Sequence, residues 1–150
     1  MADPPKTRFS ENRQLKAVVP SYIEDWDTYF LELAVAVSWK SKDPKCQVGA
    51  VITSRDRVVL STGFNGFPRG DLDRLELLSD EDEKLNWMCH AEANAIFNAA
   101  RRGVSLVGCE LFTTKFPCLS CCRAIVQAGV ERLCTHDDRY WEYASGEPIS

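Results

Sequence analysis

Hydrophobic residues early in the chain recur at helical spacing and then change to the shorter period of strands. Five apolar positions three or four residues apart predict an amphipathic helix: Trp26, Phe30, Leu33, Ala34 and Val37. Ser21 or Asp25 is suited to cap its amino end. The segment "SKDPK" ends the helix, because proline disfavours helical geometry in the residue before it.

The region that follows predicts a β-hairpin and then a loop. Two stretches rich in β-branched residues, "CQVGAVIT" and "RVVLSTGFNG", are joined by "SRDR" and are typical of paired strands. The chain then begins a loop at residue 67, where we expect a short helix around Leu72 to Leu78.

Helices and strands alternate in the second half of the chain. A helix that ends at Gly103 is indicated by an apolar stripe of Ala93, Ile96, Phe97 and Ala100. After it, "GCELFTTKFP" predicts a strand, "CLSCCRAIVQAG" a helix and "VERLCTHDD" another strand. A strand, helix and strand in succession indicate parallel pairing, with helices on the faces of the sheet. We therefore expect an α/β sandwich.

Composition and charge narrow the class of protein. A chain of 150 residues predicts one domain, over residues 21–150, after an extended or disordered lead over residues 1–20. No apolar run approaches a membrane span, and the start of the chain lacks the apolar core of a signal peptide. These features predict a cytoplasmic protein with no membrane partner. The net charge of -4 argues against nucleic acid as a partner.

Two predicted helix starts carry candidate chemistry. His90 lies in "CHAE", and Cys118 and Cys121 lie in "PCLSC" at i, i+3 on one face of a first turn. One imidazole and two thiolates suit tetrahedral Zn²⁺ and leave a fourth position for water, as in catalytic sites. Glu92 is not needed as a ligand and starts the same helix as His90, where it can move protons.

Other roles for the cysteines have to be weighed against this site. The odd total of seven cysteines argues against a complete set of internal disulfides. Cys118 and Cys121 could form a redox pair, but that would leave His90 and Glu92 unexplained. A closed structural zinc site would need a fourth ligand, for which Cys89 or Cys122 is the nearby candidate.

The remaining cysteines and the second histidine suggest no site of their own. Cys122 directly follows Cys121 and is expected to point elsewhere and pack. Cys46 and Cys89 keep no assigned role. Buried packing is expected for Cys109 and Cys134, and a loop or surface position for His136.

These motifs together resemble one enzyme family. H-x-E followed by P-C-x-x-C is the signature of zinc deaminases, and 24 residues separate Glu92 from Pro117, enough for a helix and a strand. With "SKDPKCQVGAVI", "GFNGFPRG" and "QAGVERL" in the same order, the chain resembles the deoxycytidylate (dCMP) deaminases of the cytidine deaminase superfamily over about residues 26–140. The resemblance implies a three-layer α/β/α sandwich with a mixed central sheet.

The resemblance also implies a reaction, the zinc-dependent hydrolysis of dCMP to dUMP and ammonia in pyrimidine deoxynucleotide metabolism. Zinc would supply hydroxide to C4 of cytosine, and Glu92 would carry protons to N3 and to the leaving amino group. The Ala91 backbone N–H would hold the base carbonyl, Asn65 would bind the sugar, and Phe116 would pack against the base. Asn65 could equally be a turn residue, and Phe116 part of the core.

Phosphate contacts, effectors and assembly are implied by the same family. The contacts, at the substrate or at a regulatory site, are expected from Ser41, Lys42, Lys45 and Arg69. Exposed Lys and Arg side chains are also often simply solvated. Many family members are hexamers activated by dCTP and inhibited by dTTP. We therefore expect a pyrimidine nucleotide ligand, dCTP and dTTP as effectors, and a homo-oligomer that is a hexamer or a dimer.

Two segments depart from the family pattern and leave alternatives open. The chain reads "DLDRLELLSDEDEKLNWM" where the family usually continues with "GCSDD", and this loop borders the expected pocket. It ends at "RYWEYASGEPIS", where the family continues through a further helix and strand. The substrate could instead be dCTP, CMP, a 5-modified dCMP or deoxycytidine. Two other classes are a nucleic-acid deaminase and a nucleotide sensor without turnover; the intact Glu92 disfavours the sensor.

Overall fold

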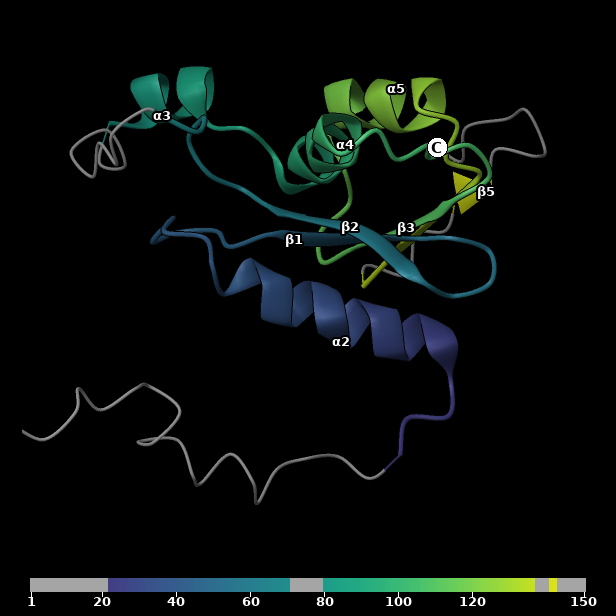
Figure 1. Cartoon of the computed structure of the whole chain (residues 1–150). Coiled ribbons are helices and arrows are strands. Elements are labelled where there is room, and N and C mark those ends of the chain that lie inside the picture. The colour runs from purple at the N-terminus through teal and green to yellow at the C-terminus, as the bar shows by residue number, and fades with distance from the viewer. Residues whose placement is uncertain (1–21, 71–79, 137–140, 143–150) are drawn as a thin grey trace, which may run out of the picture.

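The chain folds into three layers. The computed structural model describes residues 22–70, 80–136 and 141–142. In this part of the chain, a five-stranded sheet lies between helix α2 (Trp26–Ser38) on one face and helices α4 (Ala91–Arg101) and α5 (Leu119–Gln127) on the other (Figure 1). The short helix α3 (Glu81–Trp87) lies on the same side as α4. The predicted three-layer sandwich is confirmed.

The sheet is mixed, as expected. Its strand order is β2-β1-β3-β4-β5. Strands β3 and β4 are parallel and are connected through α5, whereas every other neighbouring pair is antiparallel. The predicted hairpin and the predicted parallel pair are both present. The strands are β1 (Gly49–Thr53), β2 (Val59–Phe64), β3 (Glu110–Thr113), β4 (Arg132–Thr135) and β5 (Trp141–Glu142).

Helix α2 begins and ends close to where the sequence predicts. The Asp25 carboxylate accepts a hydrogen bond from the backbone N–H of Thr28 at 2.8 Å and so caps the helix. Phe30 and Ala34 are buried against the sheet, whereas Trp26 is 44% exposed at the start of the helix. The alternative cap, Ser21, lies outside the described residues.

Helix α4 presents a different face to the sheet from the predicted stripe. Its buried apolar residues are Ala91, Ala95 and Ala99, whereas Phe97 is 57% exposed. The reason is how closely the helix approaches Gly63 of β2. A Cβ atom at Gly63 would lie 2.3 Å from both the Ala91 carbonyl oxygen and the Ala95 nitrogen. Only small side chains fit this contact, so size and not hydrophobicity selects the buried face.

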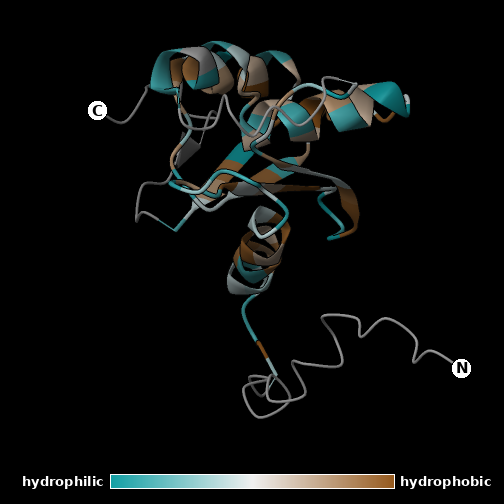
Figure 2. Cartoon of the chain, turned by 90° about the vertical axis from the view of Figure 1, so that its left-hand side faces the viewer, coloured by the Kyte–Doolittle hydropathy of each residue, from teal (hydrophilic) through white to brown (hydrophobic). Residues whose placement is uncertain are grey.

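Hydrophobic side chains fill both spaces between the layers. Because residues alternate across a strand, Ile52, Leu111 and Leu133 pack towards α4 and α5, and Val51 and Phe112 pack towards α2. Figure 2 shows this as hydrophobic colour on the strands between the helical layers. Cys109 and Cys134 are buried, as expected.

The segment before α4 differs most from the sequence prediction. The expected short helix around residues 72–78 lies outside the described residues. Helix α3 follows it at Glu81–Trp87, where no helix was predicted. No helix in the described ranges is long and apolar enough to cross a bilayer.

Candidate metal centre and active-site cavity

Two helix starts bring the predicted ligands together. His90 is the N-cap residue of α4 and Cys118 is the N-cap residue of α5, and both have extended backbone geometry. Neither side chain makes a capping hydrogen bond, so each is available to another partner. Cys121 follows in the first turn of α5 and is buried.

The three side chains have the spacing of a tetrahedral metal site. His90 Nδ1 lies 3.3 Å from Cys118 Sγ and 3.5 Å from Cys121 Sγ, and all three ligand atoms lie within 4.8 Å of one another. Zn–N and Zn–S bonds at tetrahedral angles separate their ligands by about 3.5 Å. The residues therefore fit a Zn²⁺ ion without rearrangement.

The electrostatics of Cys121 also favour a cation. Burial, and next the negative charge of Glu92, raise the pKa of the Cys121 thiol well above its ordinary value. A coordinated zinc ion reverses this preference, because it stabilises the thiolate directly. The buried Cys121 thiol, with the exposed Cys118 thiol and the Glu92 carboxylate beside it, is thus suited to holding positive charge.

Within the described residues, no fourth ligand joins the cluster. The potential metal-binding group consists of His90, Cys118 and Cys121. Cys122 turns away, and its Sγ lies 3.6 Å from the Pro117 carbonyl oxygen. Three ligands leave one coordination position for water or substrate, as catalytic zinc sites require.

Glu92 lies beside this cluster, in the first turn of α4. Its residue is only 4% exposed, and its Oε1 accepts a hydrogen bond from the Thr113 hydroxyl at 3.0 Å. Thr113 is the last residue of β3 and is fully buried. The sheet therefore fixes the carboxylate next to the metal ligands.

A cavity of about 260 Å³ opens onto these groups. His90, Glu92 and Cys118 line one part of it. Three of the predicted substrate contacts, Asn65, Ala91 and Phe116, also line it. The remaining wall residues are Asp43, Cys46, Val48, Lys84, Leu85, Met88 and Lys115.

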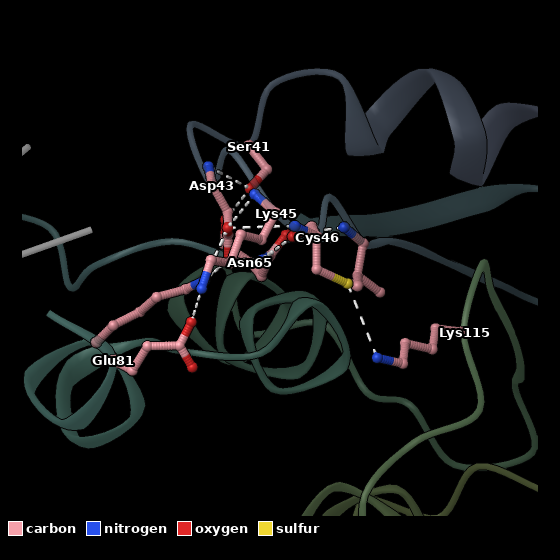
Figure 3. A network of polar contacts seen from close by, with 9 residues as sticks. Ser41, Asp43, Lys45, Cys46, Asn65, Glu81 and Lys115 are labelled. Carbon is pink, nitrogen blue, oxygen red and sulfur yellow. Dashed lines mark hydrogen bonds and ion pairs between the residues drawn. The ribbon is translucent and has the colours of Figure 1, made fainter. Parts of the chain in front are cut away.

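Asn65 connects the cavity to the loop before β1 (Figure 3). Its Oδ1 accepts a hydrogen bond from Val48 N at 2.8 Å, and its Nδ2 donates to the Cys46 carbonyl oxygen at 2.8 Å. The next residue, Gly66, exchanges two backbone hydrogen bonds with Cys89, at 3.0 and 2.8 Å. This bridge holds the segments that carry Asn65 and His90 next to each other, and both residues line the cavity. Asn65 itself lies between β2 and the bridge and not in a turn.

The four residues expected to contact phosphate lie outside the cavity wall, and three of them contact other side chains or the backbone. The Ser41 hydroxyl donates to the Asn65 carbonyl oxygen at 2.8 Å, and Arg69 donates to Asn98 Oδ1 at 2.6 Å. Lys45 forms an ion pair with Glu81 of α3, and Lys42 is exposed. None of these four residues lines the cavity: Ser41, Lys42, Lys45 and Arg69.

Two other lysines take places on the cavity wall that the sequence analysis missed. Lys84 of α3 has its Nζ 2.8 Å from each carboxylate oxygen of Asp43. Lys115 follows β3 and has its Nζ 3.8 Å from Cys46 Sγ. A signal for Lys115 was present, since it stands three residues before the ligand Cys118. For Lys84 the sequence held no such signal, because the residues of its helix, "EDEKLNW", show no hydrophobic positions at helical spacing.

The fold and the site together define a class of protein. A histidine and a glutamate at one helix start face a Cys-x-x-Cys pair at the next, above a mixed sheet. This arrangement is that of zinc-dependent deaminases.

Comparisons with known proteins identify the family within that class. Residues 24–136 match the family described as the cytidine and deoxycytidylate deaminase zinc-binding region. Deoxycytidylate deaminase of Homo sapiens is 36% identical over 124 residues, which cover 79% of this chain and 68% of the relative. A deaminase of Aliivibrio fischeri, whose function is uncharacterised, is 42% identical over 111 residues, covering 74% and 72%.

Solved structures agree with the sequence relatives. The dCMP deaminase of cyanophage S-TIM5, in complex with dCMP and dUMP, superimposes with a TM-score of 0.64 at 29% identity, covering 77% of this chain and 83% of that one. This chain belongs to the zinc-binding cytidine and deoxycytidylate deaminase family.

Proposed function

We propose that this protein hydrolyses dCMP to dUMP and ammonia. The observation that carries the proposal is the buried Glu92 carboxylate beside three zinc ligands, two of which line the same cavity as Glu92. Similarity to deoxycytidylate deaminases, one of them solved with dCMP and dUMP, supports the choice of substrate.

The residues divide the chemistry between them. His90, Cys118 and Cys121 would hold the Zn²⁺ ion, which would lower the pKa of a bound water and so provide a hydroxide nucleophile near neutral pH. Glu92 accepts a proton from the attacking water and delivers it to N3 of the cytosine ring. The same carboxylate then takes the remaining proton from the hydroxyl group at C4 and passes it to the amino group, which leaves as ammonia while the C4 carbonyl forms.

The cavity wall orients the base for this attack. Ala91 is the first residue of α4, where backbone N–H groups have no partner within the helix, so it can donate to the base carbonyl. Phe116 packs against the ring. Asn65, whose amide already bonds Val48 and Cys46, contacts the sugar through its remaining hydrogen-bonding capacity.

We further propose regulation by nucleotides, self-assembly and a cytoplasmic location. The family resemblance supports dCTP and dTTP as effectors, a homo-oligomer and a cytoplasmic location. Light scattering of the purified chain tests assembly, and dCMP turnover with and without each nucleotide tests the effectors. A single monomeric species whose activity neither effector changes would contradict them.

Absorbance loss and ammonia release across a panel of substrates test the reaction itself. The panel contains dCMP, dCTP, CMP, deoxycytidine, 5-methyl-dCMP and a single-stranded oligonucleotide. We expect dCMP to have the highest kcat/KM. Faster turnover of another free nucleotide or nucleoside would keep the chemistry and overturn the substrate. Preference for the oligonucleotide, or tight binding of dCMP without ammonia release, would overturn the function.

A further inference from the structure

The cavity wall contains two ammonium groups, and their surroundings differ. Lys84 and Lys115 are the lysines among the described residues that line it, and no arginine does. A ligand that carries a phosphate must place that charge near one of them or leave it in solvent.

Lys84 is already neutralised by its neighbour. Its Nζ contacts both oxygens of the Asp43 carboxylate at 2.8 Å, and the two side chains are only 12% and 3% exposed. The same carboxylate also accepts hydrogen bonds from the backbone N–H groups of Lys45 and Cys46. This buried pair holds α3 against the loop before β1 and adds little net charge to the cavity.

Lys115 is the uncompensated cation of the wall. Its Nζ lies 3.8 Å from Cys46 Sγ, and no carboxylate among the described residues forms an ion pair with it (Figure 3). The residue is exposed, so its flexible stem can move the ammonium group towards a ligand. In the sequence it stands between Thr113, whose hydroxyl donates a hydrogen bond to Glu92, and the metal ligand Cys118. An anion beside the reacting base would thus be within its reach.

We infer that Lys115 is a specificity-determining residue, which binds the 5′-phosphate of the nucleotide and so selects nucleotides over nucleosides. This inference rests on the proposed function, since it names the side chain that binds the phosphate of the same substrate. It places phosphate recognition on the β3–α5 connection and not on the "SKDPK" and "FPRG" segments. An ammonium group suits this role as a point charge with three donors.

The test replaces Lys115 with methionine, which keeps the length of the stem and removes the charge. We expect Lys115→Met to lower kcat/KM for dCMP by about tenfold to a hundredfold, the range of a charge-assisted contact, mainly through KM. Turnover of deoxycytidine should fall much less than that of dCMP, zinc content should be retained, and Lys115→Arg should recover part of the loss for dCMP. Lys40→Met, at an exposed position away from the cavity, is the matched control.

A binding measurement separates this inference from the proposed reaction. Calorimetric titration with dUMP and with deoxyuridine measures the phosphate contribution without turnover. We expect the preference of the wild-type chain for dUMP to shrink at least about tenfold in Lys115→Met and to persist in Lys40→Met. An unchanged preference in Lys115→Met, or an equal loss for nucleotide and nucleoside, would overturn the inference. If the wild-type chain prefers dUMP yet releases no ammonia from dCMP, the proposed function fails and this titration still decides the role of Lys115.

Discussion

The Thr113 hydroxyl donates a hydrogen bond to Glu92 Oε1 at 3.0 Å, and both residues are buried. Thr113 ends a strand and Glu92 lies in the first turn of a helix, so this contact joins the sheet to the proton-carrying group of the proposed mechanism. The same hydroxyl also lies 3.2 Å from the Lys115 carbonyl oxygen. With one proton, it can serve only one acceptor at a time.

We predict that Thr113→Val slows deamination while leaving metal binding intact. Valine keeps the shape of the side chain and removes the donor, so the Glu92 carboxylate loses a hydrogen bond worth about 1.5 kcal/mol. This loss corresponds to a decrease of about tenfold in kcat. Thr113→Ser, which keeps a hydroxyl, should retain most of the activity. A Thr113→Val protein with wild-type kcat would show that this contact does not position Glu92.

The cysteines of α5 should separate cleanly by metal content. Cys118→Ser is expected to lose stoichiometric zinc and to melt at a lower temperature, because two remaining ligands bind the ion weakly. Cys122→Ser should keep one zinc per chain, since Cys122 turns towards the Pro117 carbonyl oxygen. Metal analysis of the purified proteins makes the comparison. Zinc loss in Cys122→Ser and not in Cys118→Ser would contradict the assignment.

The close approach of α4 to β2 predicts that Gly63→Ala, a substitution outside the metal site, lowers both stability and zinc affinity. A Cβ atom there would meet backbone atoms of Ala91 and Ala95 at 2.3 Å, so the helix that carries His90 must move. We expect a loss of more than about 2 kcal/mol in unfolding free energy, together with weaker zinc binding. Gly66→Ala, whose nearest neighbour would be 3.9 Å away, is the control and should change stability little.

The Asp43–Lys84 pair predicts a pH-dependent contribution to stability. Burial by itself raises the pKa of Asp43, but hydrogen bonds from Lys84 and from the amides of Lys45 and Cys46 outweigh it and lower that pKa below 3.8. A carboxyl group whose pKa is lower in the folded state stabilises the fold above its unfolded pKa. That stability is lost as the pH falls through the folded value.

We therefore expect Asp43→Asn to cost about 3 kcal/mol in unfolding free energy at pH 6, because it leaves a buried lysine unpaired. The difference from wild type should narrow as the pH falls below about 4. Urea denaturation over a pH series measures it, with the exposed Asp82→Asn on α3 as control. A difference that is constant from pH 6 to pH 3 would contradict the role given to the ionised pair.

Sequence reasoning succeeded where the information is local. His90, Cys118 and Cys121 stand at helix starts with recognisable spacing, and a single pattern fixes both the element and the side chain. The cap at Asp25 followed from the same kind of local rule.

Sequence reasoning failed where contacts between distant segments decide. Phe97 was assigned to the buried stripe of α4 from its hydrophobicity, but close packing on Gly63 selects alanines instead. Lys84 is held at the cavity by its ion pair with Asp43, which lies 41 residues earlier in the chain, in the loop before β1. No local pattern reveals such a pair, and the polar helix that carries Lys84 was missed with it.

The most direct test of the account compares ammonia release from dCMP by the wild-type chain and by Glu92→Gln at equal zinc content. Glutamine keeps the size of the side chain and removes no metal ligand, but it cannot carry the proton. We predict that both proteins hold one zinc per chain and melt at similar temperatures, and that turnover by Glu92→Gln falls by at least about a hundredfold. Near-normal turnover in Glu92→Gln would contradict the central claim that this carboxylate works beside the metal.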